Sequence, residues 1–211
     1  MNSAMSRFSF PEFLSSFFDL VKILVMRPRC PEGDTIQIRS CNDHSVQAKC
    51  FHDDSRHMDL GDILGPEQVL SEMKASNRWE AIDELIEQLI RSAKIKPENR
   101  EAITGVVKKR ETSMSTGIGF GIGIPHASTD LIYEVVGALG RSKKGVNFDA
   151  LDNQPVTLVV LFLVPQGQFQ KHLHTLAKIA KLLHKKEFRQ ALEDAPDGKA
   201  MYDIIKAESG K

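Results

Sequence analysis

A run of alternate glycines that leads into a histidine is the part of this chain with the clearest chemical potential. The run reads Ser115-Thr116-Gly117-Ile118-Gly119-Phe120-Gly121-Ile122-Gly123-Ile124-Pro125-His126. Because glycine has no Cβ, alternate glycines along an extended segment let another backbone or a ligand, such as a phosphate group, come close to one face. A neutral imidazole is nucleophilic near pH 7, so the run indicates phosphoryl chemistry at His126.

The residues between these glycines suggest how the segment should lie. The isoleucines alternate with the glycines, so we expect them, together with Phe120, to point toward a core. Pro125 restricts its own φ and holds Ile124 in the extended region, which limits the backbone that leads into His126. The run by itself is equally compatible with a glycine-rich strand, a turn and a structural histidine.

Composition places the chain among globular proteins. It has 211 residues, 41% of them hydrophobic, and 28 basic residues balance 28 acidic ones, so nothing favours a nucleic-acid partner. The apolar stretch at residues 8–26 is interrupted by Glu12, Asp19 and Lys22, so we expect no membrane insertion and no signal peptide. Three cysteines, an odd number, fit a reducing cytoplasm, where we expect the protein to be.

Composition changes near Met58, which predicts an irregular N-terminal extension at residues 1–57 and a folded domain at residues 58–211. The extension has no clear hydrophobic period, and we expect it to be disordered or not translated, with translation then starting at Met58. A metal-binding extension is the other interpretation, although no Cys-x-x-Cys pair is present. Its candidate zinc ligands are Cys30, Cys41, Cys50, His44, His52 and His57.

Helices and strands alternate after Met58, which predicts an α/β fold with a mixed sheet covered by helices on both sides. A short strand or ledge is expected at residues 69–75. Strands are expected at residues 133–141 and 156–164. The last of these is a continuous apolar run, typical of a strand buried on both faces. Helices are expected from Ser76 or Asn77 to Ile90, from Pro97 to Glu111, and over residues 168–184, 186–192 and 199–205.

The helix expected at residues 168–184 contains two histidines on different faces. At 100° per residue, His172 shares a face with Leu176 and Leu183, whereas His174 lies among lysines and should face solvent. His172 should therefore point inward near the start of its helix, where backbone N–H groups and the helix dipole favour an anion. A core histidine with a structural role is the alternative.

Three blocks of the chain carry a resemblance to one protein family. They are Lys109-Arg110-Glu111 followed by the glycine run, the segment from Val146 to Val156, and His172-Leu173-His174-Thr175-Leu176. In this order, and over residues 58–205, they resemble the type 2 enzyme IIA domain of the bacterial phosphoenolpyruvate-dependent phosphotransferase system. The similarity is to the branch with the fructose, mannitol and nitrogen-regulatory proteins, and it implies a three-layer α/β/α fold.

The resemblance also implies roles for particular residues. His126 would accept the phosphoryl group as a tele-phosphohistidine, His172 would stabilise the phosphate, and Arg110 would supply a positive charge. The donor would be the histidine-containing phosphocarrier protein, and the acceptor a cysteine of a IIB domain or a regulated target protein. No metal or cofactor is implied. The loop that would cradle the phosphate comprises Thr116, Gly117, Gly119 and Gly121.

The chain departs from the family pattern at three positions. The family commonly has asparagine at the position of Phe120, alanine at that of Gly123 and glycine at that of Ala127, which bears on partner specificity more than on phosphorylation. We favour a regulatory protein over a sugar-specific component for fructose-type or mannitol-type uptake. A hydrolase that uses His126 with Ser128 or Asp130 is a further alternative, although no nucleophile elbow is visible.

Overall fold

A mixed sheet between two layers of helices forms the described part of the protein. The computed structural model describes residues 58–209, so the predicted extension, its zinc ligands and a start at Met58 lie outside the described residues. The strands are β1 (Val69–Leu70), β2 (Gly117–Gly119), β3 (Ile122–Gly123), β4 (His126–Thr129), β5 (Val136–Val146) and β6 (Val156–Pro165). They lie in the order β1-β5-β6-β3-β2, and β4 also pairs with β6.

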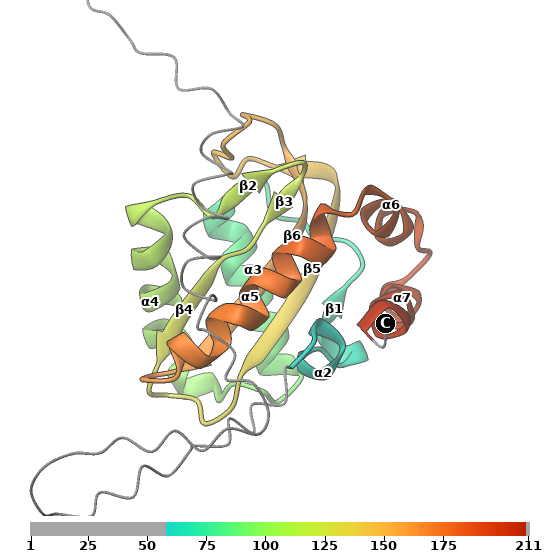
Figure 1. Ribbon diagram of the computed structural model, residues 1–211. Helices are drawn as coiled ribbons and strands as arrows, with labels where there is room; N and C mark the ends of the chain where they lie inside the picture. Colours follow the sequence, from blue (N-terminus) through green and yellow to red (C-terminus); the bar gives the residue numbers. More distant parts are fainter. Residues whose placement is uncertain (1–57, 210–211) are drawn as a thin grey trace, which may run out of the picture. The chain divides into compact units, whose positions relative to one another are not determined.

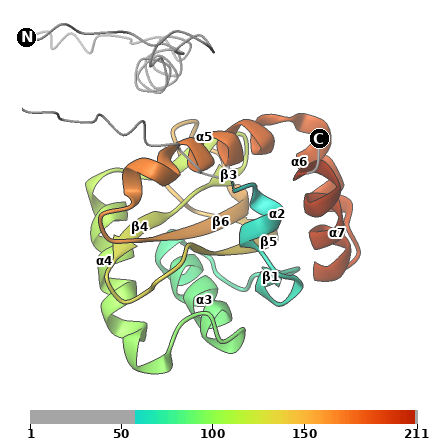
Figure 2. The ribbon, with the colours of Figure 1, turned by 60° about the horizontal axis from the view of Figure 1, so that its bottom comes forward.

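Helices cover both faces of this sheet, which confirms the predicted three-layer α/β/α fold (Figures 1 and 2). α3 and α4 lie on one face, and α5 lies on the other with α2, α6 and α7. Short 3₁₀ turns at Pro66–Gln68 and Pro97–Asn99 precede β1 and α4. The helices are α2 (Leu60–Ile63), α3 (Arg78–Arg91), α4 (Arg100–Ser113), α5 (Phe169–His184), α6 (Lys186–Asp194) and α7 (Gly198–Ser209).

β6 contributes side chains to the two hydrophobic cores, one on each face of the sheet. It pairs antiparallel with β5 and, on its other edge, parallel first with β3 and then with β4. Leu161 and Leu163 enter the core beneath α3 and α4, whereas Val160 and Phe162 enter the core beneath α5. The continuous apolar run of the sequence is therefore explained by burial on both faces, as predicted.

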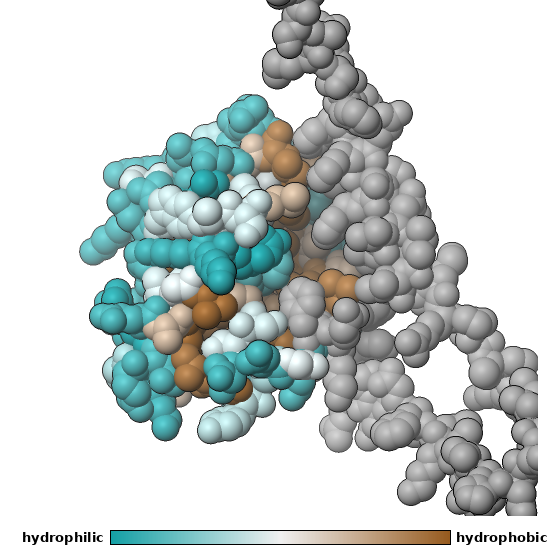
Figure 3. All heavy atoms as spheres, turned by 90° about the vertical axis from the view of Figure 1, so that its left-hand side faces the viewer, coloured by the Kyte–Doolittle hydropathy of each residue, from teal (hydrophilic) through white to brown (hydrophobic). Residues whose placement is uncertain are grey.

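α3 starts at the cap that the sequence predicts. The Asn77 side chain accepts the backbone N–H groups of Trp79 and Glu80 at 3.0 and 3.1 Å. The Glu80 carboxylate accepts the N–H and the hydroxyl of Ser76, the residue before the cap, at 2.8 and 2.7 Å. Hydrophilic residues cover most of the outer face on which α4 lies (Figure 3).

Two predicted strands differ from those observed because pairing partners decide where a strand ends. β1 has two residues, after which the N–H of Met73 still donates to the Arg141 carbonyl at 2.7 Å. β5 begins at Val136, where its pairing with β6 begins, and not at Tyr133, which is 95% exposed. Local propensity therefore located both segments but misplaced their ends.

The glycine run is a hairpin followed by an edge strand, so the expected single extended segment is wrong. β2 and β3 pair antiparallel, with Gly117 opposite Gly123. Phe120 and Gly121 form the turn between them, with φ of +56° and +76°. Pro125 then separates β3 from β4, and both of these strands run parallel to β6.

Glycine is required in the hairpin because other parts of the protein approach its backbone closely. A Cβ on Gly117 would lie 2.8 Å from the Cβ of Ala150 and 2.9 Å from its Cα. A Cβ on Gly123 would lie 3.3 Å from the ring of Phe148. The loop between β5 and β6 therefore occupies the space that these two glycines leave.

We predict that Gly117→Ala destabilises the protein by about 1–3 kcal/mol, because the added methyl group would overlap a backbone atom of Ala150. Gly105→Ala is the matched control, since no atom lies within 4 Å of a Cβ placed there in α4. That control should stabilise the protein by about 0.5–1 kcal/mol through helix propensity. Chemical denaturation measures both, and equal stability of the two variants would contradict the prediction.

Candidate functional site

His126 is the first residue of β4, and the register of that strand sets the direction of its side chain. Ala127 packs in the core beneath α3 and α4, so the alternation of a strand turns His126 toward the opposite face. Phe162, the partner of His126 on β6, packs beneath α5 on that same face. The imidazole thus lies, partly buried, on the side of the sheet that α5 covers.

A backbone carbonyl orients the ring of His126. Nδ1 lies 2.9 Å from the carbonyl oxygen of Ile124. Because a carbonyl oxygen can only accept, Nδ1 carries the proton, and the lone pair of the neutral ring is on Nε2. The hydrogen bond therefore leaves the tele nitrogen, Nε2, with the free lone pair.

The environment of His126 favours the neutral ring. Burial is the main cause that lowers the pKa of His126, and the positive charge of Arg110 lowers it further. The hydrogen bond to Ile124 acts in the opposite direction but does not cancel these effects. The pKa lies below its ordinary value, so the ring is neutral and nucleophilic near pH 7.

Arg110 lies in the last turn of α4, at the end of the helix that leads into β2. Its Nη1 donates to the carbonyl oxygen of Met114 at 3.0 Å, which holds the guanidinium over the connection to the hairpin. Its charge acts on the imidazole of His126. The structure therefore brings together these two residues of the predicted site.

His172 lies in the first turn of α5, on the face of the sheet toward which His126 points. The N–H of Gln166 donates to the carbonyl oxygen of Thr129, so the connection to α5 passes the end of β4. The side chain of His172 is partly buried. That of His174 lies outside the described side chains, so its exposure to solvent stays a prediction.

The predicted phosphate loop is packed against the protein rather than open at its glycine positions. Cβ atoms on Gly119 and Gly121 would meet the Asp152 carboxylate at 3.1 Å and the Thr157 hydroxyl at 2.8 Å. Of the two expected occupants of the glycine face, another part of the protein and a ligand, the structure has the protein at these positions. The glycines shape the backbone of the loop because the segment from Ala150 to Thr157 packs against it.

Phe120 does not point into a core as expected. It occupies the turn of the hairpin with a φ of +56°, a conformation that bulky side chains rarely adopt, and it is 49% exposed. Its ring contacts His184 edge to face at 5.5 Å between centroids, and the Arg189 guanidinium lies 5.7 Å from the ring centre. The turn reverses the chain at this residue, so period-2 alternation fails there.

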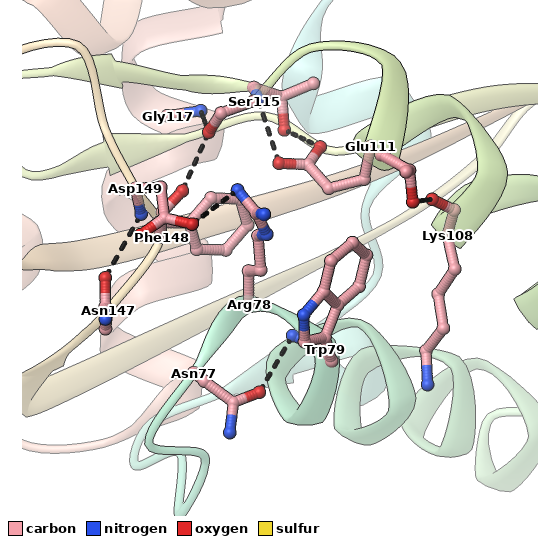
Figure 4. Close-up of polar contacts among 12 residues, drawn as sticks. Asn77, Arg78, Trp79, Lys108, Glu111, Ser115, Gly117, Asn147, Phe148 and Asp149 are labelled. Carbon is pink, nitrogen blue, oxygen red and sulfur yellow. Dashed lines mark hydrogen bonds and ion pairs between the residues drawn. The ribbon is translucent and has the colours of Figure 1, made fainter.

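Glu111 bonds to a residue of the predicted loop, which the sequence did not reveal. Its side chain is 1% exposed and its carboxylate binds both the N–H and the hydroxyl of Thr116. Figure 4 shows Glu111 reaching from α4 to the start of β2, beside Ser115 and Gly117. The available signal was its spacing, four residues after Val107 on the buried stripe of α4.

Metal ligands and membrane spans were also sought within residues 58–209. No three histidine, cysteine, aspartate or glutamate side chains gather there as a metal would require. Among the helices of the same residues, none has the length and apolar character to cross a membrane.

Comparison with known proteins decides the family. The family described as "Phosphoenolpyruvate-dependent sugar phosphotransferase system, EIIA 2" matches residues 62–208. The chain belongs to this family. It is similar to the nitrogen regulatory protein of Bradyrhizobium diazoefficiens, with 31% identity over 148 residues, 70% of this chain and 95% of that protein. The fructose-specific EIIA component of Haloferax volcanii is 32% identical over 151 residues, 70% of this chain and 97% of that protein.

A solved structure agrees with this assignment. The nitrogen regulatory protein IIA-Ntr from Neisseria meningitidis matches with a TM-score of 0.63 and 28% identity, over 69% of this chain and 97% of that one. The resemblance carried by the three sequence blocks is thus confirmed. As an EIIA type 2 domain, this part of the chain is a phosphotransfer component of the phosphotransferase system.

We predict that Arg110→Gln raises the pKa of His126, because the positive charge of Arg110 helps to lower it. NMR titration of the imidazole should give a midpoint below 6.5 in the wild type and a higher midpoint in the variant. A higher pKa leaves more of the ring protonated near pH 6, so phosphorylation should slow more there than near pH 8.

Lys109→Gln is the control for this experiment, because it removes an exposed neighbouring cation from the same helix. Its titration midpoint at His126 should match the wild type. A midpoint in Arg110→Gln at or below that of the wild type would contradict the prediction.

Proposed function

We propose that this domain carries a phosphoryl group on His126, which it receives from the phosphohistidine of the histidine-containing phosphocarrier protein. The observation that carries the proposal is the hydrogen bond from Nδ1 to the Ile124 carbonyl in a site that keeps the ring neutral. The Nε2 lone pair attacks phosphorus while the N–P bond of the donor breaks, and the donor ring keeps that electron pair. Nε2 has no proton to lose first.

The same hydrogen bond prepares the second transfer. With phosphate on Nε2 and the proton still on Nδ1, the ring of His126 carries a positive charge. The Ile124 carbonyl oxygen, 2.9 Å from Nδ1, stabilises that charge. A positively charged ring is a good leaving group, so the phosphoryl group passes on to an acceptor.

Arg110 and His172 stabilise the phosphoryl oxygens in this proposal, because transfer passes through a loose transition state with charge spread over them. The role of Arg110 is supported by the effect of its charge on the pKa of His126. The role of His172 is supported by its position on the face of the sheet toward which His126 points. The loop residues Thr116, Gly117, Gly119 and Gly121 set the backbone path beside the phosphate.

We further propose that phosphorylation of His126 regulates a target protein. The support is the similarity to nitrogen regulatory proteins over nearly their whole length. The fructose-specific relative of similar identity supports the alternative, in which the phosphoryl group passes to a IIB cysteine. Loss of uptake of one sugar in a deletion strain, restored only with a phosphorylatable His126, would favour that alternative.

We predict that phosphoenolpyruvate, enzyme I and the carrier protein together label the wild type with acid-labile, base-stable phosphate. His126→Ala should abolish this label because Nε2 of His126 is the acceptor. Label that persists in a folded His126→Ala protein would refute the assignment.

We predict that His172→Ala slows labelling of His126 by about 100-fold, since a donor to the phosphoryl oxygens is lost while the nucleophile remains. His184→Ala is the matched control, because it removes an imidazole from the opposite end of α5. Single-turnover labelling measures both rates. An unchanged rate in His172→Ala would show that His172 is only a packing residue.

A further inference from the structure

We infer that Glu111 is a positioning residue for His126, which it orients through Thr116 and Ile124. The inference rests on the proposed function, because the orientation of the ring affects activity only if His126 is the phosphoryl acceptor. It concerns a carboxylate that contacts neither the imidazole nor the phosphate in that proposal.

The first link joins α4 to the start of the hairpin. Oε1 of Glu111 accepts the N–H of Thr116 at 2.9 Å, and Oε2 accepts its hydroxyl at 2.6 Å. Both side chains are buried, with 1% and 4% exposure. Two hydrogen bonds to one residue fix both the backbone and the side chain of Thr116 relative to α4.

The second link joins the hairpin to the imidazole. The carbonyl oxygen of Thr116 accepts the N–H of Ile124 at 3.0 Å. The carbonyl oxygen of Ile124 accepts the proton of Nδ1 of His126 at 2.9 Å. A displacement of Thr116 therefore moves Ile124 and, with it, the group that orients the ring.

A second tether acts next to Thr116. The Ser115 hydroxyl donates to the Phe148 carbonyl oxygen at 2.7 Å and accepts the N–H of Gly117 at 3.1 Å. Figure 4 shows these contacts beside those of Glu111. Ser115 ties the strand to the loop between β5 and β6. Glu111 ties Thr116 to α4, the helix that carries Arg110.

Packing alone does not explain a glutamate at this position. Position 111 continues the buried stripe of Ile103 and Val107, where leucine would suit the core. It also lies in the last turn of α4, where the helix dipole disfavours a negative charge. A carboxylate that is both buried and at the unfavourable helix end indicates a positioning role for its two hydrogen bonds.

The contacts of Glu111 are two hydrogen bonds to Thr116, and its carboxylate acts on the ring through them. The charged residue that lowers the pKa of His126 is Arg110. We therefore expect a neutral glutamine to replace Glu111, since its amide oxygen can accept the Thr116 N–H and its amide nitrogen can donate to the hydroxyl. Leucine has a similar volume but can do neither.

The test measures the tautomer of His126 by ¹⁵N NMR near pH 8 and the single-turnover rate of labelling. The wild type should show the Nδ1–H tautomer. In Glu111→Leu the acceptor carbonyl is no longer held, so the Nε2–H tautomer should become populated and the rate should fall about tenfold or more. Glu111→Gln should keep the wild-type tautomer and a rate within about threefold of the wild type.

Thr116→Val keeps the bond from the backbone N–H of residue 116 to Glu111 and removes the bond from the Thr116 hydroxyl. This variant therefore tests the inference even if Glu111→Leu does not fold. It should shift tautomer and rate in the same direction by a smaller amount. A folded variant, of either kind, with the wild-type tautomer and rate would overturn the inference. Failure to label the wild type would instead reject the proposed function, because the tautomer is read without phosphoryl transfer.

Discussion

The hydrogen bond between Nδ1 of His126 and the carbonyl oxygen of Ile124 is the interaction on which the site depends. It sets the tautomer and so determines which nitrogen can act as nucleophile. The bond holds because the backbone around it is fixed on both sides. The N–H of Ile124 donates to Thr116, and the carbonyl oxygen of Pro125 accepts the N–H of Phe162 on β6. The imidazole of His126 lies on the edge strand β4, which is held by its pairing with the central strand β6.

The hairpin before His126 is built by close packing within the protein. The backbone of Ala150 packs against Gly117, and the ring of Phe148 packs against Gly123, where a Cβ would lie 3.3 Å away. Asp152 accepts the N–H of Phe120 at 2.8 Å, which fixes the turn from the same loop. The segment from Val146 to Val156, one of the three blocks that carry the resemblance, therefore supports the hairpin.

Burial and charge act together at the imidazole. Burial lowers the pKa of His126, and the positive charge of Arg110 lowers it further, so both favour the neutral ring. Phe120 lies outside this arrangement, at an exposed turn with a positive φ, against His184 and Arg189. Phe120 therefore forms part of the surface at the end of the hairpin.

The sequence by itself determined the fold class, a helix cap at Ser76 or Asn77, the doubly buried β6 and the family. Each of these follows from local periodicity or from contiguous blocks of sequence. Only the tertiary structure decided that the glycine run is a hairpin, that Phe120 is exposed and that Glu111 holds Thr116. The physical reason is that strand ends and turns depend on partners far away in the chain, here β6 and the loop that precedes it. Alternation of apolar residues and glycines along a sequence cannot reveal where the chain reverses. The role of a single buried carboxylate can be recognised only when the positions of its hydrogen-bond donors are known.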